Sequence, residues 1–201
     1  MVLLNSNAQH IFWLGRYLSR THFLCARFPF LEDEAAVAYA HAFCLPAFDA
    51  SSLNELVLDP TQVASFSQQF KVAKDNIQEL RGVLSASGYA ELMKLIKTAD
   101  KNAGYICEVV TECEDILEAE SSDIFLFFSL GQCVEQLDHQ LRLGEETSTT
   151  LCKIDYVVRI LLVEMGWNDL EQYWEQLRTE PNRIQFYQFS DHIHQLFEAD
   201  V

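Results

Sequence analysis

Glycine and proline are scarce in this chain of 201 residues, which contains seven glycines and four prolines. Tight turns between β-strands depend on these residues, and strand-like alternation of apolar and polar residues is missing too. Long hydrophobic runs are also absent: residues 124–128 form the strongest one, and a membrane-spanning helix needs roughly 18 such residues. The first ten residues lack the basic and long apolar regions of a secretory signal. We therefore expect a soluble, cytoplasmic protein made of helices.

Basic residues are few relative to acidic ones. The chain has 14 Lys and Arg against 30 Asp and Glu, which gives a net charge of −16. Nucleic acids and anionic membrane surfaces are bound largely through positive charge, so neither is an expected partner. A basic protein partner would be attracted by this charge, although acidity also serves solubility alone.

Several signatures of catalysis and metal binding are missing. The sequence has no GxSxG motif, no glycine-rich phosphate loop and no CxxC pair. A di-iron helical bundle needs Glu-x-x-His elements on two helices, and the sequence contains none. We therefore predict no metal site and no cofactor, and leave open whether the protein is an enzyme.

The cysteines are predicted to be reduced and mostly buried, because their spacing fits no zinc site. His22 and Cys25 lie one helical turn apart, which would let a base activate a thiolate. A core cysteine beside a surface histidine is the simpler interpretation. The six cysteines are Cys25, Cys44, Cys107, Cys113, Cys133 and Cys152.

Apolar residues recur every three or four positions along nearly the whole chain, which predicts an all-α fold. We expect a single domain, residues 1–201, built as a bundle of about seven to eight helices. Residues 47–59 are rich in Asp, Ser and Asn, and are expected to be a flexible connection with at most a short helix. The longest predicted helix would be a rod of roughly 40 Å over residues 89–118. The predicted helices cover residues 7–28, 32–45, 67–84, 89–118, 122–144, 151–165, 169–177 and 182–197.

The first predicted helix carries a cationic stripe. Arg16, Arg20 and Arg27 fall within roughly 40° of one another on a helical wheel, and Trp13 and Tyr17 flank them. One interpretation is an exposed basic face. The aromatic flanks favour another, in which the guanidinium groups are partly buried and need carboxylates, a phosphate or an anionic ligand.

A row of carboxylates offers one complement to that stripe. Glu108, Glu112 and Asp115 follow one another at i, i+4 and i+7, so they share one helix face. They would either neutralise the arginines inside the bundle or form a solvated acidic face.

A short internal repeat suggests that two helices approach closely. LGRYLSR at residues 14–20 matches LGQCVEQ at residues 130–136, an offset of 116 positions. Each copy follows a pair of aromatic residues and contains one glycine, Gly15 or Gly131. We expect a weak two-fold repeat in which both glycines allow close helix packing.

Three segments resemble the bacterial alpha-E family, an all-helical domain named for a Glu-Arg pair. FWLGRYLSRTHFLCARF at residues 12–28 is similar to the family's opening pattern, YWLGRYLERAENxAR. KDNIQELRGVLS at residues 74–85 and FFSLGQCVEQ at residues 127–136 resemble its middle segment and its second Glu-Arg segment. The chain departs from the pattern at the pairs themselves, because Ser19 replaces the first Glu and Gln136 replaces the second Arg. It resembles a short, divergent member.

The resemblance implies an association with ATP-grasp-type ligases and transglutaminase-like peptidases, beside which the family is encoded or to which it is fused. It also carries over Arg16, Arg20 and Glu135 as residues of a candidate site. Since each pair has lost one half, Arg20 and Glu135 are predicted to form one surviving ion pair between the two segments.

We therefore expect a non-catalytic accessory or substrate-presenting subunit of a bacterial peptide-modification system with an ATP-grasp or transglutaminase-like partner. One alternative is an amide-bond-forming or peptide-modifying enzyme that binds a carboxylate or phosphate at the Arg/Glu cluster. A second alternative is a purely structural interaction protein, in which the cluster fixes the helix register. A homo-oligomer is compatible with each of these.

Overall fold

The computed structural model describes residues 3–99 and 103–198, which form ten α-helices and no strand. The all-α prediction is confirmed, whereas the expected count of seven to eight helices was too low. The helices are α1 (Asn5–Arg27), α2 (Asp33–Ala42), α3 (Ala50–Leu58), α4 (Phe66–Glu79), α5 (Ala86–Ala99), α6 (Ala103–Glu118), α7 (Ser122–Leu143), α8 (Ser148–Glu164), α9 (Leu170–Thr179) and α10 (Arg183–Glu198).

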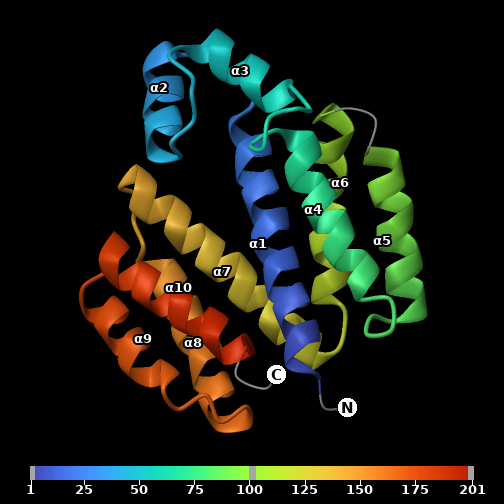
Figure 1. Ribbon diagram of the computed structural model, residues 1–201, viewed down its shortest axis with the longest axis vertical. Helices are drawn as coiled ribbons and strands as arrows, with labels where there is room; N and C mark the ends of the chain where they lie inside the picture. The colour runs from blue at the N-terminus through green and yellow to red at the C-terminus, as the bar shows by residue number, and fades with distance from the viewer. Residues whose placement is uncertain (1–2, 100–102, 199–201) are drawn as a thin grey trace.

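Helices α1 and α7 cross at the centre of the fold (Figure 1). Helices α4, α5 and α6 lie on one side of this crossing, α8, α9 and α10 lie on the other, and α2 and α3 cover one end. Helix α1 buries an apolar face in this packing, and Ile11, Leu14 and Leu18 on it are fully inaccessible to solvent. None of the described helices is both long and apolar enough to cross a membrane.

The two repeated glycines lie where α1 and α7 touch. A Cβ atom on Gly131 would overlap the carbonyl oxygen of Phe12, and one on Gly15 would overlap the carbonyl oxygen of Phe128. The backbones are thus in direct contact, with no room for any side chain between them. The predicted close approach at both glycines is confirmed, and it brings the two copies of the repeat against each other.

Three of the helix ends follow local signals in the sequence. The Ser65 hydroxyl accepts a hydrogen bond from the backbone N–H of Gln68 at the start of α4, and Asn182 caps α10 in the same way. Gly144 ends α7 with a φ of 68°, the left-handed conformation that glycine adopts without strain.

The predicted 40 Å rod over residues 89–118 is wrong. Its described parts are two helices, α5 and α6, which lie side by side (Figure 1), while residues 100–102 fall outside the described ranges. Each half has its own apolar stripe, so folding back buries both stripes, whereas a straight rod would leave much of them in solvent.

The expected connection over residues 47–59 contains the short helix α3. Together with the division of residues 89–118 into α5 and α6, it raises the helix count above the predicted one. Asp49 accepts a hydrogen bond from the backbone N–H of Ser52, and the Ser52 hydroxyl accepts one from the backbone N–H of Asp49. This capping box satisfies the first turn of α3, which explains why a segment rich in Asp, Ser and Asn is helical.

Candidate functional site

The arginine stripe of α1 meets one buried carboxylate on α7. Glu135 is 1% exposed, and its Oε2 atom accepts a hydrogen bond from Arg16 Nε at 2.9 Å. Arg20 binds the same carboxylate twice, from Nε to Oε1 at 2.6 Å and from Nη2 to Oε2 at 2.9 Å. The predicted contact between Arg20 and Glu135 is therefore confirmed, and Arg16 joins it.

These contacts explain the charge state of the cluster. Burial by itself would raise the pKa of Glu135, but the positive charges of Arg20 and Arg16 and their hydrogen bonds hold it below its usual range. Glu135 is therefore ionised at neutral pH, and two guanidinium groups share one carboxylate.

Two aromatic rings cover the guanidinium groups. The Cζ atom of Arg16 lies 5.2 Å from the centre of the Trp13 ring, and that of Arg20 lies 5.2 Å from the centre of the Tyr17 ring. Both distances permit cation–π attraction, and Arg16 is only 7% exposed. The partly buried interpretation of the stripe therefore holds for this pair of arginines.

Arg27 belongs to a different environment. Its Nη2 atom donates to Glu145 at 2.9 Å, and both side chains are substantially exposed. The stripe therefore divides into a buried cluster and a surface ion pair.

The carboxylate row of α6 does not neutralise the arginines. Glu108, Glu112 and Asp115 are all exposed, and the arginine partners come from Glu135 and Glu145 instead. The solvated-face interpretation is correct, because the buried face of α6 is formed by its apolar stripe.

A cavity of about 350 Å³ adjoins the cluster beside Arg20 and Glu135. Its other polar lining residues include Gln69, Asp138 and Arg142, none of which was predicted from the sequence. Arg142 Nε donates to Asp138 Oδ1 at 2.9 Å, and their i, i+4 spacing was the available signal. The buried Oε1 atom of Gln69 accepts no hydrogen bond from the described residues.

His139 lies one turn beyond Glu135 and is 3% exposed. Its ring packs against Phe23 and Phe43, with centroids 4.8 and 4.9 Å away. Burial, followed by the charge of Arg27, lowers the pKa of His139 to about 4. The imidazole is therefore neutral in the folded protein at neutral pH.

His139 is expected to weaken the fold on acidification. Its pKa is depressed in the folded state, so its stabilising contribution is complete above about pH 6.5 and is lost as the pH falls from about 6.5 to about 4. We expect a loss of about 2–3 kcal/mol in the free energy of unfolding over this range. Urea denaturation at a series of pH values measures it.

His139→Phe is the matching variant, because the pocket is aromatic and Phe cannot be protonated. It should flatten the stability profile between pH 6.5 and 4. Replacement of His22 is the control. The hydrogen bond of His22 with Glu114 raises the pKa of His22, so its contribution to the free energy of unfolding weakens as the pH rises instead. An unchanged slope in His139→Phe would contradict the assignment.

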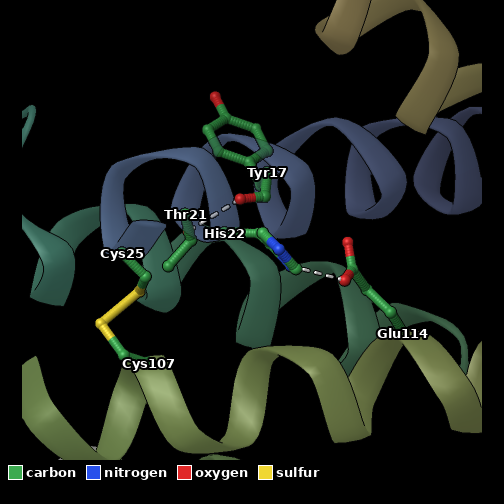
Figure 2. The surroundings of a disulfide bond; sticks show 6 residues. All are labelled: Tyr17, Thr21, His22, Cys25, Cys107 and Glu114. Carbon is green, nitrogen blue, oxygen red and sulfur yellow. Dashed lines mark hydrogen bonds and ion pairs between the residues drawn. A yellow bond between two sulfur atoms is a disulfide. The ribbon is translucent and has the colours of Figure 1, made fainter. Parts of the chain in front are cut away.

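Cys25 of α1 and Cys107 of α6 form a disulfide bond (Figure 2). Their Cα atoms are 5.3 Å apart, although 82 positions separate them in sequence. The prediction that the cysteines are reduced is wrong for this pair, because the packing of α1 on α6 is not visible in their spacing. Cys44 and Cys152 are exposed thiols, so the cysteines are also less buried than predicted.

The same face of α1 carries His22 one turn earlier. Its Nδ1 atom lies 3.0 Å from Glu114 Oε2 on α6, while Tyr17 points to the other side of α1 (Figure 2). Because Cys25 is oxidised and His22 is paired with Glu114, these residues do not form the thiolate and base considered above.

Reduction of the disulfide is expected to raise the thiol count of the denatured protein from four to six. The free energy of unfolding should fall by roughly 2–4 kcal/mol, because the bond closes a long loop in the unfolded chain. Thiol titration and urea denaturation, each with and without reductant, measure these effects. Cys25→Ser is the control, and reductant should leave its stability unchanged. Six reactive thiols without reductant would refute the bond.

A larger hollow, which we call the α7–α8 groove, lies beside the face of α1 that carries His22. It has a volume of about 900 Å³ and is walled mainly by α7 and α8, with contributions from α1 and α6. Its facing walls include Leu126, Ser129 and Cys133 of α7 and Cys152, Tyr156 and Ile160 of α8.

Comparison with known proteins identifies one family. The model of the Alpha-E family, described as a predicted alpha-helical domain with a conserved ER motif, matches residues 3–189. The curated proteins and the solved structures contain no match. Arg20 and Glu135, which the family resemblance assigns to the two Glu-Arg pairs, bind each other. With nearly its whole length matched, the chain belongs to the Alpha-E family.

Proposed function

We propose that this chain is a non-catalytic accessory or substrate-presenting subunit of a bacterial peptide-modification system. The partner is an ATP-grasp-type ligase or a transglutaminase-like protein, as expected from the family resemblance, and the system is cytoplasmic.

One observation carries the non-catalytic part of this proposal. Both oxygens of Glu135 accept hydrogen bonds from arginines of α1, and the carboxylate is almost completely buried. A general acid or base must reach the substrate, and a buried carboxylate that holds two helices together does not. The retained charges of the motif therefore serve the packing of α1 on α7.

Affinity purification of the tagged chain from its native cells tests the proposal. We expect an ATP-grasp or transglutaminase-like protein at near-equal amount, retained through moderate salt. A tagged, unrelated protein of similar net charge is the control, because any strongly acidic protein collects basic ones. A purified ligase whose turnover is the same with and without this chain, or a chain recovered alone, would refute the proposal.

The cavity beside Arg20 supports a second candidate, an enzyme that binds a small carboxylate or phosphate. The Arg20 side chain is 33% exposed and lines this cavity, so its guanidinium group could donate hydrogen bonds to an anion there. Thermal stabilisation by acetate or inorganic phosphate, lost in Arg20→Gln and kept in Arg27→Gln, would favour this candidate. No shift with either anion would remove it.

A further inference from the structure

We propose that the α7–α8 groove binds a basic amphipathic helix of a partner protein. The inference rests on the proposed function as a partner-binding subunit, and it specifies the chemistry of the segment that is bound.

The spacing of the residues that line the groove matches the contact surface for a third helix. Lining residues of α7 recur every three or four positions between 122 and 136, and those of α8 do so between 149 and 164. Each helix thus presents a continuous stripe to the same space, which is how helices in bundles contact a third helix. The α7 stripe spans roughly 21 Å, which matches an occupant of about four turns.

Apolar and aromatic side chains are interspersed with polar ones along both stripes. Leu126 and Cys133 line the α7 wall, and two large side chains at the groove remain exposed, Phe125 by 42% and Tyr156 by 68%. Burial of these two rings under an apolar helix face would supply the hydrophobic contribution to binding.

One end of the groove is acidic. A four-residue connection joins α7 to α8, so the start of α7 and the end of α8 lie at the same end. This end gathers Glu118 of α6, Asp123 of α7 and Glu164 of α8, and Lys153 is the single lysine or arginine among the described residues that line the groove. An occupant with Lys or Arg at this end is therefore favoured.

A second copy of this chain fits poorly. Each copy carries a net charge of −16, so an acidic groove would face another acidic surface. A basic segment from a different protein meets no such repulsion.

A direct binding test uses a labelled 15-residue peptide of leucine and lysine, with leucines at helical i, i+3 and i+4 spacing. We expect micromolar binding by fluorescence anisotropy, weakened by salt. Replacing every lysine by glutamate, or rearranging the same residues in strict alternation, should abolish it. These two peptides separate the contributions of charge and of helical pattern.

Native cysteines report where the peptide sits. Cys152 lines the groove and is exposed, whereas Cys44 is exposed but does not line it. Cys113 and Cys133 are buried, which raises their pKa to about 12 and about 11, so they compete little for an alkylating reagent at neutral pH. Bound peptide should slow alkylation of Cys152 at least several-fold and leave the rate at Cys44 unchanged.

Variants test the groove itself. Ser129→Trp should fill it and abolish binding, with circular dichroism and the melting temperature confirming the fold. Tyr156→Asp is a second, exposed change that should weaken binding. The double variant Glu118→Lys, Glu164→Lys should weaken binding about tenfold. Its control is the double variant Glu108→Lys, Glu171→Lys, which changes the net charge equally at exposed sites outside the groove. The control should change the affinity by less than about twofold.

The outcomes are decisive in both directions. Binding that protects Cys152 and is lost in the folded Ser129→Trp protein supports the inference. No binding, equal binding of the glutamate peptide, or equal losses in the two charge variants would overturn it, as would concentration-dependent dimerisation that Ser129→Trp removes. The proposed function is tested separately. If wild type and Ser129→Trp recover a ligase equally, the proposed function stands and only the groove proposal is refuted.

Discussion

Glu135→Ala is expected to lower the free energy of unfolding by about 3–5 kcal/mol, the largest effect predicted for any single substitution here. Removal of the carboxylate leaves the Arg16 guanidinium buried, 7% exposed, without its partner. A buried charge without a partner keeps its full desolvation cost, and Arg cannot escape that cost by losing its proton. Urea denaturation at neutral pH measures the change.

Glu145→Ala is the matched control, because it also removes an arginine partner of α1. The pair of Glu145 with Arg27 is substantially exposed, so we expect a loss below about 1 kcal/mol. Similar losses in the two variants would show that burial does not set the energy of the cluster. Replacing Arg16 and Glu135 together by leucine should recover much of the loss, since Arg20 then keeps partial contact with solvent.

Gly131→Ala is the second large effect, with an expected loss of about 3–4 kcal/mol. The new methyl group would overlap the backbone carbonyl of Phe12 on α1. A side chain would yield by changing its rotamer, but a helix backbone yields only if α1 and α7 move apart, which loosens the central contact of the fold. Thermal and urea denaturation measure the loss.

Gly82→Ala is the control for this change. Gly82 is exposed, and a Cβ atom built there meets no atom within 4 Å. Its stability should change by less than about 0.5 kcal/mol. If Gly131→Ala were equally mild, the backbones of α1 and α7 would not be in the contact described.

Much of the cluster was predictable because its components repeat along the chain. The offset of 116 positions aligns Arg20 with Gln136 and Ser19 with Glu135, and the family resemblance implies that each segment keeps one half of a Glu-Arg pair. The two helices meet at facing glycines, which brings Arg20 of one segment close to Glu135 of the other. A buried charge needs a partner, and the observed ion pair satisfies both residues. Arg16 as a second donor to Glu135 was not predicted, because the cationic stripe alone does not tell which arginine faces α7.

Periodicity and capping residues are local properties, and for this reason helix positions, the all-α class and the end of α7 at Gly144 were accessible from the amino-acid order. Four features were not accessible in this way: the Cys25–Cys107 bond, the reversal between α5 and α6, the exposure of Glu108 and the groove between α7 and α8. Each of these depends on which helix faces lie together across many positions, and a stripe of apolar residues specifies that a face is buried without specifying its neighbour. Long-range packing therefore decided the partners of Cys25 and Arg27 on α1.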